Sequence, residues 1–242
     1  MTSYVLIPGA GGDAWYWHLA APQLEARGHE AIAVQLPAGD DSAGWGEYAD
    51  AIERSIGDRT DLILVAQSLA GFSAPLVCAR RKVTLLVLLN AMIPMPAETG
   101  EAWGSNTDRK EAEQAYFAQI GLPPESADDD RIIYFHDVSQ EVVDEAFRRG
   151  EPAQSWTPMT QRWPLDTWPD VPTRVLASRQ DRLFPLEFQR RVARERLGIE
   201  ADQIEGGHLV ALSRPTELAD RLDGFGLEAA LPPAWTGTIR RP

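Results

Sequence analysis

An apolar run that ends in small residues around one serine constrains this chain more than any other feature. Residues 62–71 read Leu-Ile-Leu-Val-Ala-Gln-Ser-Leu-Ala-Gly, and a plausible helix continues from Phe72 to Arg80. Such a segment predicts a buried strand that turns sharply into a helix and lifts the Ser68 hydroxyl clear of the sheet edge. The crowded backbone of that turn needs small residues two positions before and after the serine, where this chain has Ala66 and Ala70.

Two polar residues later in the chain strengthen the interpretation of Ser68 as a nucleophile. Asp181 follows the apolar segment 175–177, and His208 follows the short segment 203–205 and two glycines. Loops that follow parallel strands gather at one edge of a sheet, so we expect the three side chains to meet there. The usual motif around such a serine is G-x-S-x-G, and this chain has alanine in place of both glycines. On that motif alone, an ordinary strand followed by a capped helix would be the better explanation.

Apolar strands alternate with helices along most of the chain. Strands with continuous apolar character need cover on both faces, which is typical of a parallel sheet between two layers of helices. The pattern therefore predicts an α/β fold with about six parallel strands. We predict strands at residues 4–7, 30–35, 62–66, 84–90, 173–177 and 201–205, and helices at 13–27 and 45–56.

The segment 94–169 interrupts this alternation. It holds two helical stretches at 108–120 and 141–149, an acidic turn at 128–130, and many prolines and tryptophans. We interpret it as a helical cap inserted into an α/β core. The predicted boundaries are 1–93 and 170–230 for the core, 94–169 for the cap and 231–242 for a C-terminal tail.

Composition excludes several classes of partner. The 242-residue chain has a net charge of -13, which argues against nucleic acid as a partner because phosphate binding needs a basic face. The single cysteine, Cys78, excludes an intrachain disulfide. We find no apolar run long enough to span a bilayer and no signal peptide, so the expected location is cytoplasmic.

Cofactors are not expected from the sequence. The four histidines are scattered, so no metal site is predicted. The glycines at positions 9, 11 and 12 have a rival interpretation as a phosphate cradle, but they lack the spacing G-x-G-x-x-G and no P-loop lysine follows. A small-molecule substrate is the expected partner. The sequence leaves open whether the protein is a monomer or a homodimer.

Taken together, the motifs resemble the α/β-hydrolase superfamily, and more narrowly its branch of plant methylesterases and hydroxynitrile lyases. The order nucleophile, acid, histidine is the order in that superfamily. The similarity extends over nearly the whole chain and is that of a bacterial serine esterase. The branch motifs H-G-A, S-L-G-G, D-x-x-x-P and G-H are matched here by Pro8-Gly9-Ala10, Ser68-Leu69-Ala70-Gly71, Asp181 with Pro185, and Gly207-His208.

The resemblance implies a serine hydrolase. A carboxylesterase that acts on a small to medium, apolar ester is the first hypothesis, with Ser68 as nucleophile, His208 as base and Asp181 as the residue that orients it. The oxyanion hole would use the backbone N–H groups of Ala10 and Leu69. The same triad also serves lactone, amide or C–C hydrolysis and lyase chemistry, and some proteins with this fold are ligand receptors without catalysis.

We expect the substrate pocket to combine the first loop with the cap. Gly9 and Gly11 let the backbone approach a substrate closely. Most aromatic residues of such a cap pack it onto the sheet, and two or three of them are expected to face the cavity. The candidates are Trp103, Phe117, Tyr134, Trp156, Met159 and Trp163.

Three departures from the branch pattern affect the expected chemistry. Pro8 replaces a histidine that is mainly structural in the family. Leu209 occupies the position where hydroxynitrile lyases carry a lysine that handles cyanide, which disfavours cyanohydrin cleavage. Asn90 follows the strand after which some relatives carry the acid, and asparagine supplies no charge, so Asp181 keeps that role.

Overall fold

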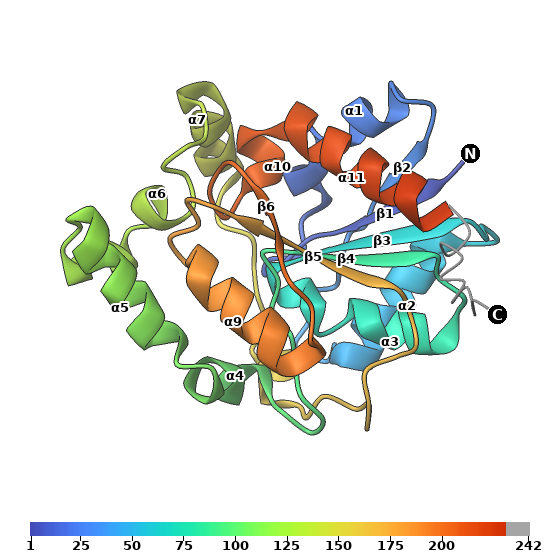
Figure 1. Ribbon diagram of the computed structural model, residues 1–242, viewed down its shortest axis with the longest axis horizontal. Helices are drawn as coiled ribbons and strands as arrows, with labels where there is room; N and C mark the ends of the chain where they lie inside the picture. Colours follow the sequence, from blue (N-terminus) through green and yellow to red (C-terminus); the bar gives the residue numbers. More distant parts are fainter. Residues whose placement is uncertain (231–242) are drawn as a thin grey trace, which may run out of the picture.

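Six strands form one parallel sheet, which confirms the predicted fold class (Figure 1). The strand order is β2-β1-β3-β4-β5-β6 in the computed structural model, which describes residues 1–230. Leu6, Val65 and Val87 lie side by side on the three central strands. The predicted tail, 231–242, lies outside the described residues. The strands are β1 (Ser3–Ile7), β2 (Glu30–Ala33), β3 (Leu62–Gln67), β4 (Leu85–Leu89), β5 (Thr173–Ser178) and β6 (Asp202–Ile204).

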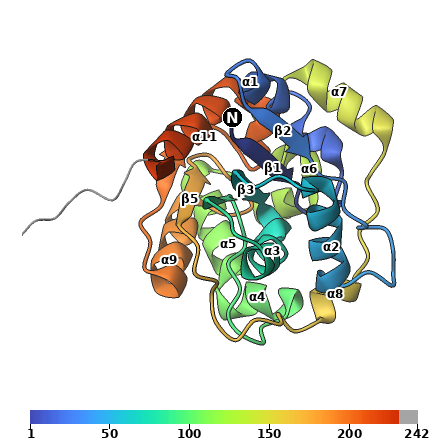
Figure 2. The ribbon, with the colours of Figure 1, turned by 90° about the vertical axis from the view of Figure 1, so that its right-hand side faces the viewer.

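Helices cover both faces of the sheet, as Figure 2 shows. Alternate residues of each strand enter opposite hydrophobic clusters: Val5 and Leu64 face one cluster, and Leu6 and Val65 face the other. The first face carries α2 (Trp45–Ile56), α3 (Ala74–Arg80) and α9 (Leu186–Leu197). The second face carries η1 (Ala14–Trp17), α1 (Ala21–Glu25), α10 (Val210–Ser213) and α11 (Pro215–Ala230).

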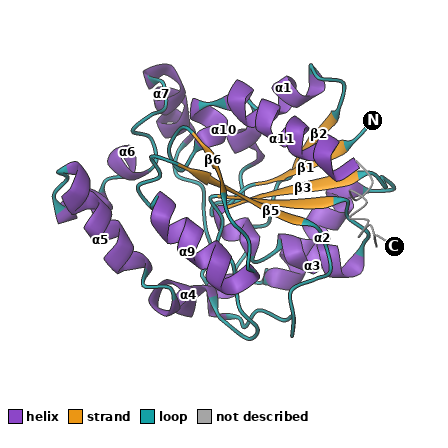
Figure 3. Ribbon diagram, in the orientation of Figure 1, coloured by secondary structure: helices purple, strands orange, loops and turns teal. Residues whose placement is uncertain are grey.

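Several helices lie between β4 and β5, where the sequence predicts an inserted cap, and Figure 3 shows helices and loops along this segment. It is anchored by two buried indoles, since Trp103 Nε1 donates to the Ile93 carbonyl at 3.1 Å and Trp163 Nε1 donates to the Phe72 carbonyl at 2.9 Å. The limits 94 and 169 stay a prediction. The elements are α4 (Gly100–Asn106), α5 (Arg109–Ile120), η3 (Pro124–Asp128), α6 (Asp130–Ile133), α7 (Gln140–Arg149) and α8 (Thr157–Thr160).

Two predicted helices differ from those observed. The helix predicted at 13–27 is divided into η1, capped by Asp13, and α1. Pro22 lies in the first turn of α1, where its missing N–H costs no hydrogen bond, and this favours a new helix start there. The segment after Ser68 likewise forms a 3-10 turn, η2 (Ser68–Gly71), before α3 begins with Pro75 in its first turn.

Among the described residues, none of the helices combines the length and the apolar character that a membrane span requires.

Gly71 allows the segment after β4 to pack directly against the turn that carries Ser68. The Met92 N–H donates to the Ser68 carbonyl at 3.0 Å, and a Cβ atom on Gly71 would overlap the Met92 carbonyl oxygen. Because that obstacle is backbone, it cannot move aside as a flexible side chain would. A glycine is therefore required three positions after the serine, although alanine is tolerated at Ala70.

We predict that Gly71→Ala lowers the free energy of unfolding by about 1–3 kcal/mol, the usual range for forcing extra atoms into a packed core. The matched control is Gly224→Ala in α11, where a Cβ would meet no atom within 4 Å. Replacing glycine by alanine inside a helix typically stabilises by about 0.5–1 kcal/mol. Urea unfolding of both variants measures the two changes, and equal effects would contradict the packing argument.

Candidate active site

Ser68 lies at the strained turn that the sequence predicts. Its φ angle is 53°, in the left-handed region that non-glycine residues rarely adopt. Such strain is kept only where the surroundings impose it, and it is typical of functional turns. Ala66, Ser68 and Ala70 are all buried, with 0%, 8% and 2% of each residue exposed.

Asp181 and His208 are brought together across the ends of two neighbouring strands. Asp181 follows β5, His208 follows β6, and His208 Nδ1 lies 2.8 Å from Asp181 Oδ2. Both residues are buried, with exposures of 0% and 2%. A carboxylate at this distance fixes the imidazole so that Nδ1 carries the proton and Nε2 is left to accept one.

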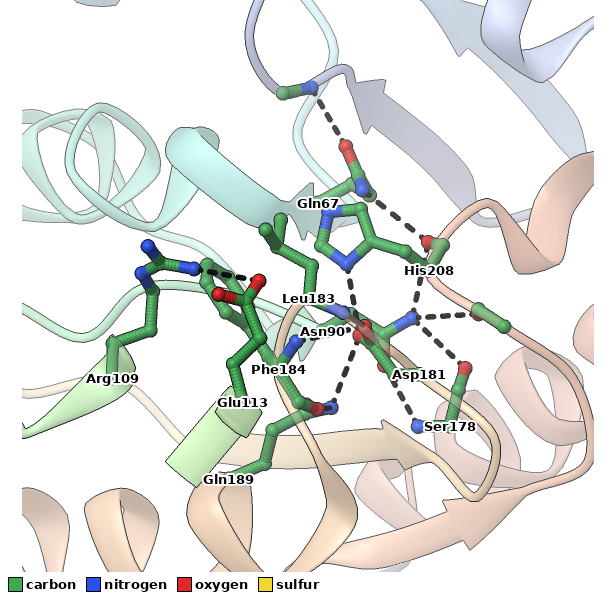
Figure 4. Close-up of polar contacts among 12 residues, drawn as sticks. Gln67, Asn90, Arg109, Glu113, Ser178, Asp181, Leu183, Phe184, Gln189 and His208 are labelled. Carbon is green, nitrogen blue, oxygen red and sulfur yellow. Dashed lines mark hydrogen bonds and ion pairs between the residues drawn. The ribbon is translucent and has the colours of Figure 1, made fainter. Parts of the chain in front are cut away.

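Both oxygens of the Asp181 carboxylate accept hydrogen bonds (Figure 4). Its Oδ1 accepts from the backbone N–H groups of Leu183 and Phe184, both at 2.9 Å. Its Oδ2 accepts from Gln189 Nε2 at 3.3 Å in addition to His208. A buried carboxylate is tolerated only when such partners replace water, and these contacts hold it in place.

Two side-chain amides hold the backbone of the histidine loop, a role that the sequence does not reveal for either: Asn90 stands out there only as the position of an alternative acid, and Gln67 does not stand out. Asn90 Nδ2 donates to the carbonyl oxygens of Gly207 at 3.3 Å and His208 at 3.2 Å, and to Ser178 Oγ at 2.9 Å. Gln67 Nε2 lies 3.5 Å from the same His208 carbonyl. Figure 4 shows these amides and the His208 ring in one network. The amide of Asn90 therefore has a positioning task that a carboxylate acid at this site would not perform.

Ser68 is the third member of the expected triad. The structure joins it to the other two through its neighbour Gln67, whose side chain reaches the His208 backbone. Within the described residues, Ser68 Oγ makes no hydrogen bond to His208. Catalytic hydrogen bonds of this kind are often long without substrate and tighten in the Michaelis complex.

The first loop lies against the serine turn, as an oxyanion hole requires. The Gly9 N–H donates to Gln67 Oε1 at 3.0 Å, and a Cβ on Gly9 would come within 2.8 Å of Ser68 Cβ. Gly9 is therefore needed for this close approach. Within the chain that the structure describes, the backbone N–H groups of Ala10 and Leu69 have no acceptor, so both stay available as donors.

A cavity of about 360 Å³ opens beside this loop. Its lining includes Gly9, Ala10, Gln67 and Leu209, but not Ser68 or His208 themselves. The rest of the lining comes mainly from the segment around η1 and from the insertion. These residues are mostly apolar or aromatic, with Asp13, Asp130, Arg149 and Glu151 as the charged members, and the others include Trp15, Tyr16, Phe135, Ala146, Phe147 and Pro152.

None of the six cap residues expected in the pocket lines this cavity. Trp103 and Trp163 are buried in the cluster on the first face, and their indole N–H groups are bound to backbone. Phe117 is also buried, Met159 packs against Gly100, and Trp156 is exposed. The sequence alone does not distinguish an aromatic residue that packs the cap from one that lines the cavity, because the path of the chain decides this. Here these residues mainly attach the insertion to the core.

Tyr134 and Gly11 have specific places near the site. The Tyr134 ring meets the His208 ring edge-on, with 5.7 Å between centroids. Burial raises the pKa of Tyr134 to about 12, so its hydroxyl stays protonated at neutral pH. Gly11, unlike Gly9, does not line the cavity. It has a φ of 80°, and a Cβ there would meet the side chain of Pro152 at 2.7 Å. Within the described residues, no group of three histidine, cysteine or acidic side chains is arranged to hold a metal ion.

The profile of the alpha/beta hydrolase family matches residues 4–221. Methylesterase 3 of Arabidopsis thaliana is 32% identical over 103 residues, which cover 37% of this chain and 39% of that protein. The chain thus matches well under half of that relative's length. Polyneuridine aldehyde esterase of Rauvolfia serpentina is 23% identical over 246 residues, which cover 89% of this chain and 92% of that protein.

Solved structures share the same fold. A mutant of polyneuridine aldehyde esterase superimposes with a TM-score of 0.75 at 20% identity, covering 93% of this chain and 98% of that one. A pyrethroid hydrolase from Sphingobium faniae JZ-2 gives a TM-score of 0.71 at 21% identity, covering 93% and 97%. At such identities the likeness concerns the fold alone.

We predict that Asn90→Asp destabilises the protein in a pH-dependent manner. A carboxylate at this position would face two carbonyl oxygens in the interior, so its pKa in the folded state would lie above the value of about 3.9 in the unfolded chain. Stability is then lost as the pH rises above about 4, and at pH 7 the loss should reach about 3–5 kcal/mol.

Urea unfolding of Asn90→Asp at pH 4 and pH 7 tests this prediction. Asn90→Leu is the control, because it removes the same donor but introduces no titrating group. The loss in Asn90→Leu should be the same at both pH values relative to wild type. An equal loss in Asn90→Asp at both pH values would contradict the arrangement described here.

Proposed function

The chain belongs to the alpha/beta hydrolase family, and on that premise we propose that it is a serine esterase that cleaves small to medium, apolar carboxylic esters. Ser68, His208 and Asp181 form its proposed triad. The single observation that carries the proposal is the buried contact of 2.8 Å between His208 Nδ1 and Asp181 Oδ2, behind the strained turn at Ser68.

The proposed reaction proceeds through an acyl-enzyme. Ser68 Oγ attacks the ester carbonyl while His208 Nε2 takes its proton, and the resulting imidazolium is stabilised by the Asp181 carboxylate. The tetrahedral intermediate collapses when the imidazolium protonates the leaving alcohol. Water then attacks the acyl-serine while His208 takes its proton. The bond between the acyl carbon and Ser68 Oγ breaks as His208 returns that proton to Oγ, which releases the acid and restores the enzyme.

Negative charge on the former carbonyl oxygen needs fixed donors. The backbone N–H groups of Ala10 and Leu69 are proposed for this task, because the Gly9 contacts hold the first loop against the serine turn. One such donor typically contributes about 3–4 kcal/mol of transition-state stabilisation. Since both are backbone groups, their contribution depends on the packing of Gly9 and Gln67.

The shape of the cavity supports an apolar ester as substrate. Its lining combines the aromatic residues Trp15, Phe135 and Phe147 with four charged residues, and it includes Ala10, whose N–H is proposed to bind the oxyanion. Apolar walls with a few polar groups at one end are typical of sites for small molecules. The names of the matched relatives, a methylesterase and an aldehyde esterase, agree with ester substrates.

The second candidate function is another reaction by the same triad, namely lactone, amide or C–C hydrolysis or lyase chemistry. Leu209 lines the cavity. In the branch that this chain resembles, hydroxynitrile lyases carry a lysine at that position, so leucine there disfavours cyanohydrin cleavage. The two lysines of the chain, Lys82 and Lys110, lie elsewhere in the sequence. Lactone and amide hydrolysis need the same groups as ester hydrolysis, so a substrate panel separates them. A cytoplasmic location stays a prediction.

We predict that Ser68→Ala lowers the rate of p-nitrophenyl ester hydrolysis by about a thousandfold or more, because the covalent route is lost. The purified protein is assayed on p-nitrophenyl acetate and butyrate, and on a panel of lactones, amides and cyanohydrins. Labelling by a fluorophosphonate reports nucleophilic serine independently of the substrate.

Ser73→Ala is the matched control for this experiment. Ser73 is a buried serine five positions further on, and its hydroxyl donates only to the Ala70 carbonyl. It should keep both the activity and the labelling of wild type. If Ser68→Ala and wild type hydrolyse esters equally fast, the proposal is wrong. Labelling of Ser68 without ester turnover would instead favour the second candidate.

We also predict that Ala146→Trp selects against large substrates. Ala146 on α7 lines the cavity, so an indole there would reduce the space for an acyl chain. KM for p-nitrophenyl octanoate should rise about tenfold or more, while p-nitrophenyl acetate should be little affected. Ala118→Trp on the exposed side of α5 is the control. Equal effects on short and long esters would place the substrate elsewhere.

A further inference from the structure

A short stretch of the insertion, residues 132–137, contacts both loops that carry the triad partners of Ser68. The Ile132 carbonyl accepts from Arg182 Nη1 at 2.9 Å, next to Asp181. The Tyr134 ring meets the His208 ring. Asp137 Oδ2 accepts from the Gly207 N–H at 2.7 Å, immediately before His208. The insertion therefore touches the catalytic loops as well as the cavity.

The contact between Asp137 and Gly207 depends on the absence of side chains in the histidine loop. A Cβ on Gly207 would lie 2.7 Å from Asp137 Oδ1 and 2.7 Å from His136 Nε2. Gly206 has a φ of 118°, which bends the loop so that the next N–H points toward the insertion. Within the described residues, this is the single hydrogen bond of the Asp137 side chain.

We propose that Asp137 is a positioning residue that holds the His208 loop from the side of the insertion. This inference rests on the proposed function, because holding the loop affects catalysis only if His208 is the base. Asp137 does not touch the reacting atoms and does not line the cavity. It acts through the Gly207–His208 backbone.

Opposed contacts explain why one more hydrogen bond matters here. Asn90 and Gln67 hold the His208 carbonyl from the sheet, and Asn90 also holds the Gly207 carbonyl. All of these contacts hold carbonyl oxygens. Gln180 holds Gly206 at both ends, since its side chain accepts from the Gly206 N–H and its backbone N–H donates to the Gly206 carbonyl at 3.0 Å. Within the described residues, the partner of the Gly207 N–H is Asp137, which holds it from the side of the insertion. Without it, the imidazole can shift while Asp181 stays in place, and a misplacement of about 1 Å can cost about a hundredfold in rate.

Asp137→Ala and Asp137→Asn test the proposal, with Asp144→Ala as matched control. Asp144 is an exposed carboxylate of the same insertion and is bonded to Gln140 within α7. We expect Asp137→Ala to lower kcat about tenfold to a hundredfold while KM changes less than about twofold. Asp137→Asn keeps an oxygen acceptor at the same position, so it should restore kcat to within about threefold of wild type.

Two readouts separate this inference from the proposed function. The rate of phosphonylation of Ser68 should fall in Asp137→Ala in parallel with kcat, whether or not the assayed ester is the natural substrate. Hydrogen exchange of the peptide that contains the Gly207 amide should be faster in Asp137→Ala than in wild type, and unchanged in Asp144→Ala. Exchange reports the loop directly, without reference to any reaction.

Several outcomes would overturn the proposal. Wild-type kcat and phosphonylation in Asp137→Ala would show that the loop needs no restraint from the insertion. A loss in Asp137→Asn equal to that in Asp137→Ala would mean that the hydrogen bond to Gly207 is not the cause. If Asp137→Ala does not fold, Asp137→Asn and its exchange rate decide alone. If wild type is neither labelled nor active, the proposed function fails, and this inference fails with it even if exchange at Gly207 responds.

Discussion

The fully enclosed Asp181 carboxylate is the constraint on which the rest of the site depends. None of its surface is exposed, and two backbone N–H groups, Gln189 and His208 replace water around it. Those donors come from the loop after β5, from α9 and from the loop after β6. Each of these elements must therefore be in place before the charge can be buried, and a misfolded loop would leave the carboxylate unpaired.

The parallel sheet brings loops that are far apart in the sequence to one edge. Because all six strands run in the same direction, the loops after β1, β3, β4, β5 and β6 emerge at one end, where Ala10, Ser68, Asn90, Asp181 and His208 lie. Side-chain amides then fix the spacing between loops: Asn90 joins the ends of β4 and β5 to the histidine loop, and Gln67 joins the serine turn to the first loop and to the histidine loop. These buried amides keep the loops in register without adding charge next to Asp181.

The sequence was sufficient to predict the sheet, the serine turn and the pairing of Asp181 with His208, because apolar runs and local turn chemistry are short-range signals. It was not sufficient to identify Gln67, Asn90 or Asp137, whose partners are backbone atoms far away along the chain. The same reason explains the pocket: Trp103 and Phe135 are both aromatic residues of the insertion, but only the path of that chain decides that the first is packed and the second lines the cavity.

The two indole hydrogen bonds of Trp103 and Trp163 have a consequence for motion. Both rings are inserted among the side chains beneath the sheet, so the beginning and the end of the insertion are part of the same cooperative unit as the strands. Lifting the insertion as a rigid body would expose core surface to water and break the two buried hydrogen bonds that the indole N–H groups donate. Any widening of the cavity is therefore expected from the stretch between these two tryptophans, which includes α7 with Ala146 and the exposed Phe147.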